Sequence, residues 1–165
     1  MAQILPFDRF CLLNRTLTQD EFRELHGASL HLFFFEVREG EEVFRTQVSQ
    51  VQASQARAKG RGVAPVQKDH DSNLFLGMIT LGRAENNDIV IQHERISSFH
   101  AHFRSEGERL FLTDSNSTNG TEVNGIRLTP NEAVEVRPND LIRFGDELTA
   151  CVLDVEELYL HVAGG

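Results

Sequence analysis

Residues 110–125 read LFLTDSNSTNGTEVNG, a short apolar run, a polar stretch and a short run with two β-branched residues. Leu110–Asp114 and Thr121–Val123 are rich in the aliphatic, aromatic and β-branched residues that favour strands. Asn119-Gly120 and Asn124-Gly125 are strong turn signals, because Asn and Gly tolerate a positive φ. The stretch therefore predicts two short strands that are joined by a polar loop and followed by a tight turn.

The same alternation of short apolar runs and turn residues continues over residues 73–155. Many short strands at this spacing indicate an all-β protein, either a β-sandwich or a barrel. The remaining strand candidates are Leu30–Val37, Val43–Val48, Leu74–Leu81, Ile89–Ile91, His100–Arg104, Val134–Val136, Leu141–Phe144 and Leu148–Leu153.

A helix is expected before the first strand, over residues 17–27. Thr18 and Glu21 have the spacing of a capping box, in which each side chain satisfies a backbone N–H of the other residue. Phe22 and Leu25 fall on one face of this helix. A short N-terminal helix is therefore predicted ahead of the strands.

Two further segments differ from the strand pattern. Asp154–Val162 can form a C-terminal helix that Asp154 caps, with Leu158 and Val162 facing inward. Residues 50–72 contain no aromatic residue and are rich in Ala, Gln, Gly and basic side chains. We therefore expect a long mobile loop or linker over residues 50–72.

Composition limits the class of protein. The chain has 165 residues, 40% of them hydrophobic, and a formal net charge of −9. This length suits one domain, and the negative charge argues against nucleic acid as the main partner. No run of about 20 apolar residues is present, so no contact with a membrane through a spanning helix is expected.

Cys11 and Cys151 match no metal or redox spacing and fit a cytoplasmic protein, either as two core thiols or as one disulfide.

Motifs for catalysis or metal binding are missing. Residues 69–73 begin like a calcium loop, but Leu74 stands where that loop needs glycine and Thr80 where it needs glutamate. His100 and His102 share one face of a predicted strand, without cysteine or acidic residues at ligand spacing. No nucleophile–base pair stands out. We therefore expect a protein that is not an enzyme and holds no cofactor or metal.

Four polar residues in the predicted loops suit an anion. Arg83 follows a glycine at the end of a predicted strand, and Ser97, Thr118 and Asn119 lie in loops between strands. Together they offer a permanent cation, two hydroxyls and an amide, which can hold a tetrahedral dianion by charge-assisted hydrogen bonds. The alternative is that the three uncharged side chains only satisfy the backbone of their own turns.

Several ordered motifs around these residues resemble the forkhead-associated (FHA) domain family. The resemblance covers residues 76–150 and is specific because the motifs occur together and in order. The matching segments are Gly82-Arg83, Ser97-Ser98-Phe99-His100, Ser117-Thr118-Asn119-Gly120-Thr121, Asn124-Gly125 and Asn139-Asp140-Leu141-Ile142-Arg143-Phe144-Gly145.

The resemblance implies a two-sheet antiparallel β-sandwich that binds phosphothreonine peptides through the loops at one end. By the family pattern, Arg83 and Ser97 hold the phosphate, and Thr118 assists them. Asn119 is expected to hold the peptide backbone beside the phosphothreonine. Arg recognition of phosphate is the general strategy of such modules.

Other positions are expected to be architectural or to depart from the family pattern. Gly82, His100 and Gly120 are expected to shape and brace the binding loops. Ser98, which stands where the family often has a basic residue, is also expected to contact the phosphopeptide. Arg95, two positions before the key serine, is expected to supply that charge from the same loop.

The resemblance leads to one leading hypothesis and one alternative. The leading hypothesis is an FHA-like sandwich over residues 29–155, with a helical extension over 1–28 and a C-terminal segment over 156–165. It would act as an adaptor that binds a phosphothreonine-containing protein, such as a Ser/Thr kinase or its substrate. The alternative is a phospho-independent interaction or dimerisation scaffold, motivated by the insertion and by apolar residues near the N-terminus, namely Phe7, Phe10, Leu12 and Leu13.

Overall fold

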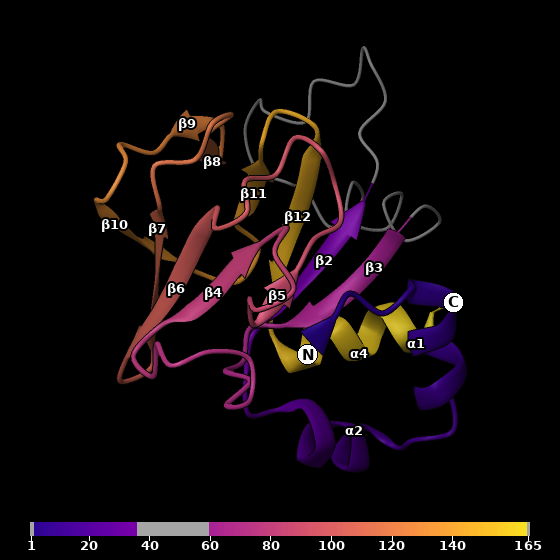
Figure 1. The fold of residues 1–165 in the computed structure, drawn as a ribbon. Coiled ribbons are helices and arrows are strands. Elements are labelled where there is room, and N and C mark those ends of the chain that lie inside the picture. Colours follow the sequence, from indigo (N-terminus) through magenta and orange to yellow (C-terminus); the bar gives the residue numbers. More distant parts are fainter. Residues whose placement is uncertain (1, 36–59, 165) are drawn as a thin grey trace.

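The computed structural model describes residues 2–35 and 60–164. Within these ranges the chain forms two six-stranded sheets that face each other, with helices beside one of them (Figure 1). The expected all-β, two-sheet sandwich with short helices is therefore confirmed.

The first sheet is antiparallel except at one edge, where β1 and β5 run parallel to their partners β5 and β4. It carries the strand ends from which the predicted loops depart. In spatial order its strands are β1 (Ala2–Gln3), β5 (Ile89–Val90), β4 (Ile79–Gly82), β6 (Ala101–Glu106), β7 (Arg109–Asp114) and β10 (Ala133–Val136).

The second sheet is antiparallel throughout the described residues. In spatial order its strands are β3 (Gly60–Pro65), β2 (His31–Phe35), β12 (Leu148–Leu153), β11 (Leu141–Phe144), β8 (Thr121–Val123) and β9 (Ile126–Arg127).

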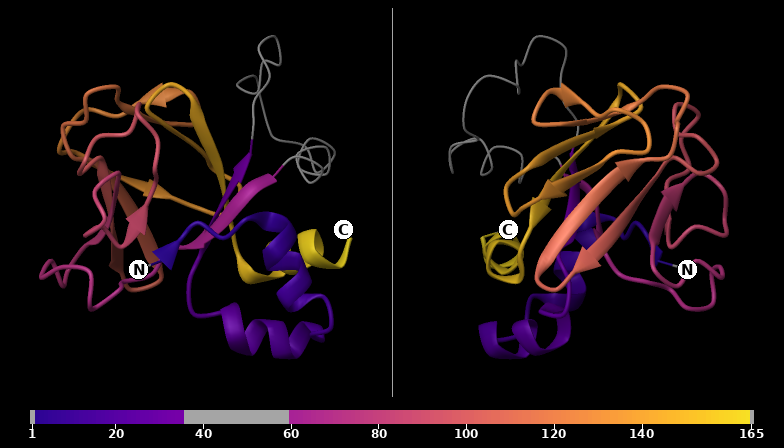
Figure 2. Two further views of the ribbon diagram at one scale, coloured as in Figure 1. Left: turned by 45° about the vertical axis from the view of Figure 1, so that its right-hand side comes forward. Right: turned by 90° about the vertical axis from the view of Figure 1, so that its left-hand side faces the viewer.

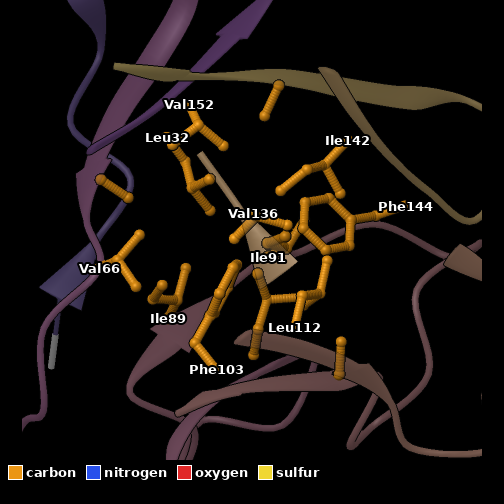
Figure 3. Packing of buried hydrophobic residues seen from close by; sticks show 14 of the residues in the cluster. Leu32, Val66, Ile89, Ile91, Phe103, Leu112, Val136, Ile142, Phe144 and Val152 are labelled. Atoms are coloured by element: carbon orange, nitrogen blue, oxygen red, sulfur yellow. The ribbon is translucent and has the colours of Figure 1, made fainter. Parts of the chain in front are cut away.

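The main core lies between the two sheets. Phe103 and Leu112 from the first sheet point toward Leu32 and Ile142 from the second, and all four are fully buried (Figure 3). In β6 the buried Ala101 and Phe103 alternate with the more exposed His102 and Arg104, as expected for a sheet with one face in the core.

A second core lies on the outer face of the second sheet. There α1 (Phe7–Asn14) and α4 (Val155–Ala163) lie beside the sheet, and α2 (Gln19–His26) packs against α4 (Figures 1 and 2). Phe10, Phe22 and Leu158 of these helices are buried in this core. This cover explains why every residue of β2 and β12 is buried. Strands that are covered on both faces read as continuous apolar runs instead of an alternation.

The two predicted helices are confirmed, with their caps. Thr18 and Glu21 form the capping box of α2, and Asp154 forms the equivalent box of α4. Leu25, however, is 65% exposed, so only Phe22 of the expected apolar pair is buried. Helix α1 was not predicted, because Pro6 precedes it without a side-chain cap.

The expected loop over residues 50–72 is wrong for part of its length. Gly60–Pro65 form β3, which pairs with β2 and is held on its other side by Leu5. Residues 50–59 and the expected strand Val43–Val48 lie outside the described residues. The predicted strand Leu74–Leu81 is shorter than expected, because β4 begins only at Ile79.

Both cysteines are free thiols, which settles the two alternatives left open by the sequence. Cys151 is buried in the second core, and Cys11 packs against its edge. Burial raises the pKa of Cys151 to about 12, so this thiol stays protonated. None of the helices among residues 2–35 and 60–164 is long and apolar enough to cross a membrane.

Candidate functional site

Gly82 brings two loops together at the end of β4. A Cβ atom at this position would lie 2.3 Å from the carbonyl oxygen of Ser98 and 2.9 Å from Nδ2 of Asn87. Only glycine therefore allows β4 to approach the following loop so closely. The contact is reinforced by the backbone, because the N–H groups of Arg83 and Ala84 donate to the carbonyls of Ser97 and Ser98.

The Arg83 side chain is held at its stem and available at its tip. Its Nε donates to the carbonyl oxygen of Ile96 at 3.1 Å, which fixes the guanidinium beside the loop that carries Ser97. The residue is exposed. Among the described residues, no carboxylate oxygen lies within 4.0 Å of a guanidinium nitrogen of Arg83, the limit for an ion pair. Arg83 therefore presents an uncompensated positive charge at the loop surface.

Ser97 and Thr118, which are 21 positions apart in the sequence, meet at this surface. The backbone N–H of Thr118 donates to the Ser97 hydroxyl at 3.0 Å, and the two hydroxyl oxygens lie 3.4 Å apart. The pair places two hydroxyl donors next to the Arg83 loop. Both hydrogens can rotate toward an incoming acceptor.

His100 is hydrogen-bonded to both the loop that carries Ser97 and the loop that carries Thr118. It is fully buried, its Nδ1 accepts from the backbone N–H of Ser97 at 3.1 Å, and its Nε2 donates to the carbonyl of Gly120 at 3.0 Å. This pairing requires the neutral ring, and burial lowers the pKa of His100. A structural role for His100 stays a prediction, and these contacts support it.

Asp114 anchors the loop that carries Thr118. Its carboxylate accepts hydrogen bonds from the Ser117 N–H, from the Ser117 hydroxyl at 2.6 Å and from the Thr121 hydroxyl at 2.6 Å. Burial raises the pKa of Asp114, but these hydrogen bonds outweigh it and the net pKa is lowered. The loop also needs a positive φ at Asn116 and Gly120, which these residue types tolerate.

Asn119 keeps one half of its amide available. Its Nδ2 donates to the carbonyl of Arg95 at 2.9 Å, which orients the side chain, while Oδ1 has no partner among the described residues. This oxygen can accept a backbone N–H from an extended peptide. Gly145 supports the same corner, since its N–H donates to the carbonyl of Gly120.

The two remaining predicted residues take different places. Ser98 is exposed beside Ser97, and its carbonyl accepts from the Asn87 amide at 2.7 Å. Arg95 lies in the same loop as expected, but its guanidinium pairs with Asp146, with 3.0 Å between Nε and Oδ1. Its charge is therefore compensated within the chain.

Three residues of this region were not singled out from the sequence. Asn87 and Asp114 fix the two loops by hydrogen bonds, and Asp146 compensates Arg95. The signal for Asp114 was present, because an Asp followed three positions later by Ser forms a local side-chain turn. No such local signal marks Asp146, because it lies 51 positions from its partner Arg95 in the sequence.

The arrangement as a whole suits a bound anion. A guanidinium with no carboxylate partner among the described residues, two neighbouring hydroxyls and an oriented amide converge from three loops onto one surface at the same end of the sandwich. Nothing in the described part of the chain resembles a metal centre, since it contains no group of three or more His, Cys, Asp or Glu side chains that could hold an ion.

Comparison with known proteins agrees with this geometry. The FHA domain family model matches residues 79–145. FHA domain-containing protein PS1 of Arabidopsis thaliana is 41% identical over 70 residues, which are 41% of this chain and 5% of that protein. Protein FraH of a Nostoc species is 29% identical over 110 residues, which are 61% of this chain and 35% of that protein. The chain thus spans only a small part of the length of these relatives.

Solved structures show the same fold at low sequence identity. The FHA domain of a hypothetical Arabidopsis thaliana protein has a TM-score of 0.51 at 23% identity, covering 76% of this chain and 85% of that one. The FHA domain of protein CT664 from Chlamydia trachomatis has a TM-score of 0.51 at 16% identity, covering 77% and 98%. A domain from a study of phosphothreonine-dependent FHA interactions has a TM-score of 0.50 at 21% identity, covering 76% and 96%.

The ordered motifs, the two-sheet sandwich, the converging loops and the family match lead to one conclusion. Residues 79–145 of this chain match the FHA domain family, whose members generally bind phosphothreonine peptides, and the chain has the fold of solved FHA domains.

Proposed function

We propose that this chain is a phosphothreonine-binding adaptor module in Ser/Thr-kinase signalling. The observation that carries the proposal is the Arg83 guanidinium, which has no carboxylate partner in the part of the chain that the structure describes, beside the hydroxyl pair of Ser97 and Thr118. A partner would be a phosphothreonine-containing protein, such as a kinase or a substrate of one.

Each side chain has a distinct task in this proposal. Arg83 pairs with the phosphate dianion, and the hydroxyls of Ser97 and Thr118 donate to its oxygens. Hydrogen bonds between charged partners are shorter and stronger than neutral ones. The Asn119 oxygen accepts a backbone N–H of the peptide, which fixes the strand of peptide beside the phosphothreonine.

The net charge of −9 does not oppose this role. Charges separated by more than a Debye length, about 8 Å at physiological salt, are largely screened. The electrostatic potential at the loop surface is therefore set by Arg83 and its neighbours. The distant acids mainly slow the approach of acidic peptides.

The proposal is tested by calorimetric titration with three matched peptides that carry phosphothreonine, phosphoserine or unmodified threonine. We expect the phosphothreonine peptide to bind most tightly. Arg83→Ala should weaken its binding by at least about tenfold, because a hydrogen bond to a charged group contributes roughly 1.5–3 kcal/mol.

Arg104→Ala is the matched control. Arg104 is an exposed arginine on β6 that pairs with Glu106, away from the three loops. Its loss should leave the affinity unchanged. Equal affinity for the three peptides, or a cellular complex that is indifferent to Arg83→Ala, would favour the phospho-independent scaffold instead.

A further inference from the structure

Most arginines in residues 79–153 are paired with acids. Residues 79–153 contain seven arginines. Five of them form ion pairs with a carboxylate, and the two without such a partner among the described residues are Arg83 and Arg127. The paired ones are Arg95, Arg104, Arg109, Arg137 and Arg143.

Arg127 lies directly against the candidate phosphopeptide loop. It extends from β9, and its guanidinium carbon Cζ lies 2.5 Å from the place where a Cβ atom of Gly120 would stand. The guanidinium therefore rests on the bare backbone of Gly120, next to Asn119 and two positions after Thr118. The glycine at 120 thus makes room for the cation as well as for the turn.

The acids nearest to Arg127 are already engaged by other arginines. Glu122 stands opposite Arg127 in the β8–β9 pairing, but its carboxylate lies 2.6 Å from Nη2 of Arg143. Asp146 lies within electrostatic range of Arg127 and is held by Arg95. Arg127 is exposed, so a carboxylate or phosphate from outside can reach it.

We propose that Arg127 forms a second anion subsite, which binds a carboxylate or a second phosphate on the peptide whose phosphothreonine lies at Arg83. This inference rests on the proposed function. The site would make the protein selective for phosphothreonine sequences that carry a further negative charge nearby.

The spacing limits where that charge can be. Thr118 and Gly120 are two residues apart, so their Cα atoms are at most about 7.6 Å apart. An extended peptide advances about 3.3 Å per residue. The second anion should therefore lie within about three residues of the phosphothreonine.

A purely structural role for Arg127 makes a different prediction. If the guanidinium only covers Gly120 and stiffens the loop, its loss would lower the affinity for all phosphothreonine peptides equally. If it forms a subsite, its loss would lower the affinity only for the peptides that carry the second negative charge. The two roles can therefore be separated by peptide choice.

The experiment uses a set of phosphothreonine peptides in which one position, from three before to three after the phosphothreonine, is Gln, Glu or phosphoserine. Affinities are measured for the wild type, for Arg127→Gln and for Arg137→Gln. Arg137 is the matched control, an exposed arginine that pairs with Glu135.

We expect the wild type to prefer Glu over Gln by about three- to tenfold at one or two positions, and phosphoserine by more, since it carries about −1.5 to −2 charges. Arg127→Gln should abolish this preference. Its affinity for the Gln peptides should stay within about twofold of the wild-type affinity. Arg137→Gln should keep it.

Two results would overturn the subsite while leaving the proposed function intact. One is a wild type that binds the Gln peptides but shows no preference for Glu or phosphoserine at any position. The other is an Arg127→Gln protein whose affinity for all the peptides is lower by the same factor. Failure of the folded wild type to bind any phosphothreonine peptide would instead overturn the proposed function, and the subsite with it.

Discussion

At the scale of single residues, the candidate site depends on a glycine that lets two loops touch. An alanine at Gly82 would press its Cβ against the Ser98 carbonyl, which is backbone and cannot rotate away. We expect Gly82→Ala to lower the free energy of unfolding by about 1–3 kcal/mol. Phosphopeptide affinity should fall as well, because Ser97 is displaced.

Gly77→Ala is the control for this change. A Cβ at Gly77 meets no atom within 4 Å, so this variant should match the wild type in urea unfolding and in peptide titration. If Gly82→Ala were as stable and as active as Gly77→Ala, the close approach of the two loops would not be a requirement of the site.

Asp146 is expected to restrain the site by occupying Arg95. Its replacement in Asp146→Asn removes the charge but keeps a residue that tolerates the positive φ of 32° at this position. The freed Arg95 should then strengthen binding of a phosphothreonine peptide by roughly two- to fivefold at low salt.

Glu106→Gln provides the comparison for Asp146→Asn, because it frees Arg104 in the same way on a distant part of β6. We expect no change in affinity from it. A gain of equal size in both variants would indicate a general effect of net charge, and Arg95 would lose its assigned role.

The residues of the candidate site were predictable where a short motif carries them. Arg83, Ser97, Thr118 and Asn119 each belong to such a motif, and the fold brings them to one end of the sandwich. The pairing of Arg95 with Asp146, and the position of Arg127 on Gly120, depend on contacts between loops that are distant in sequence. No local pattern encodes such contacts.

At the scale of elements, α2 and β2 enclose a buried histidine whose charge state affects stability. His31 on β2 is 2% exposed, and its ring lies 5.9 Å from that of His26 on α2. Burial, with a smaller contribution from His26, lowers the pKa of His31 to about 4. The unfolded chain takes up this proton near pH 6.5.

The direction of the pH effect follows from these two values. Between about pH 6.5 and 4 the unfolded state binds the proton and the folded state does not, so stability falls as the pH falls. His31 alone should lower the free energy of unfolding by about 2 kcal/mol between pH 7 and pH 5.

Urea unfolding at pH 7 and pH 5 checks this, with His31→Gln as the variant that cannot take up the proton. The loss of stability between the two pH values should be smaller in His31→Gln than in the wild type. Equal losses would show that His31 does not titrate differently in the two states.

Elements were predictable where the local pattern agreed with the final environment. The capping boxes at Thr18 and Asp154 mark α2 and α4, and β11 and β12 follow their apolar runs. The segment of β3 reads as Gly-Arg-Gly-Val-Ala-Pro, which is poor in strand formers. It becomes a strand because β2 and Leu5 pair with it, and that is a tertiary effect.

At the scale of the whole molecule, the second core joins the helices to the second sheet of the sandwich. Phe22 of α2 is fully buried and contacts Phe10 of α1 and Tyr159 of α4, with ring centroids 6.2 and 5.3 Å apart. Phe22→Ala should lower the free energy of unfolding by about 3–5 kcal/mol. Since the helices lie away from β8 and β9 and the loop before them, peptide affinity should persist in the folded protein (Figure 1).

Leu25→Ala is the matched change on the same helix, because Leu25 is 65% exposed. It should alter stability by less than about 0.5 kcal/mol. Urea unfolding of both variants tests the shared core, and a Phe22→Ala protein as stable as Leu25→Ala would mean that α2 is only loosely attached.

The most direct test of the central claim is a crystal structure of this protein with a bound phosphothreonine peptide. We predict that the phosphate oxygens contact the Arg83 guanidinium and the hydroxyls of Ser97 and Thr118, with the peptide backbone at Asn119. A phosphate bound elsewhere on the surface, with Arg83 turned toward solvent, would contradict the account.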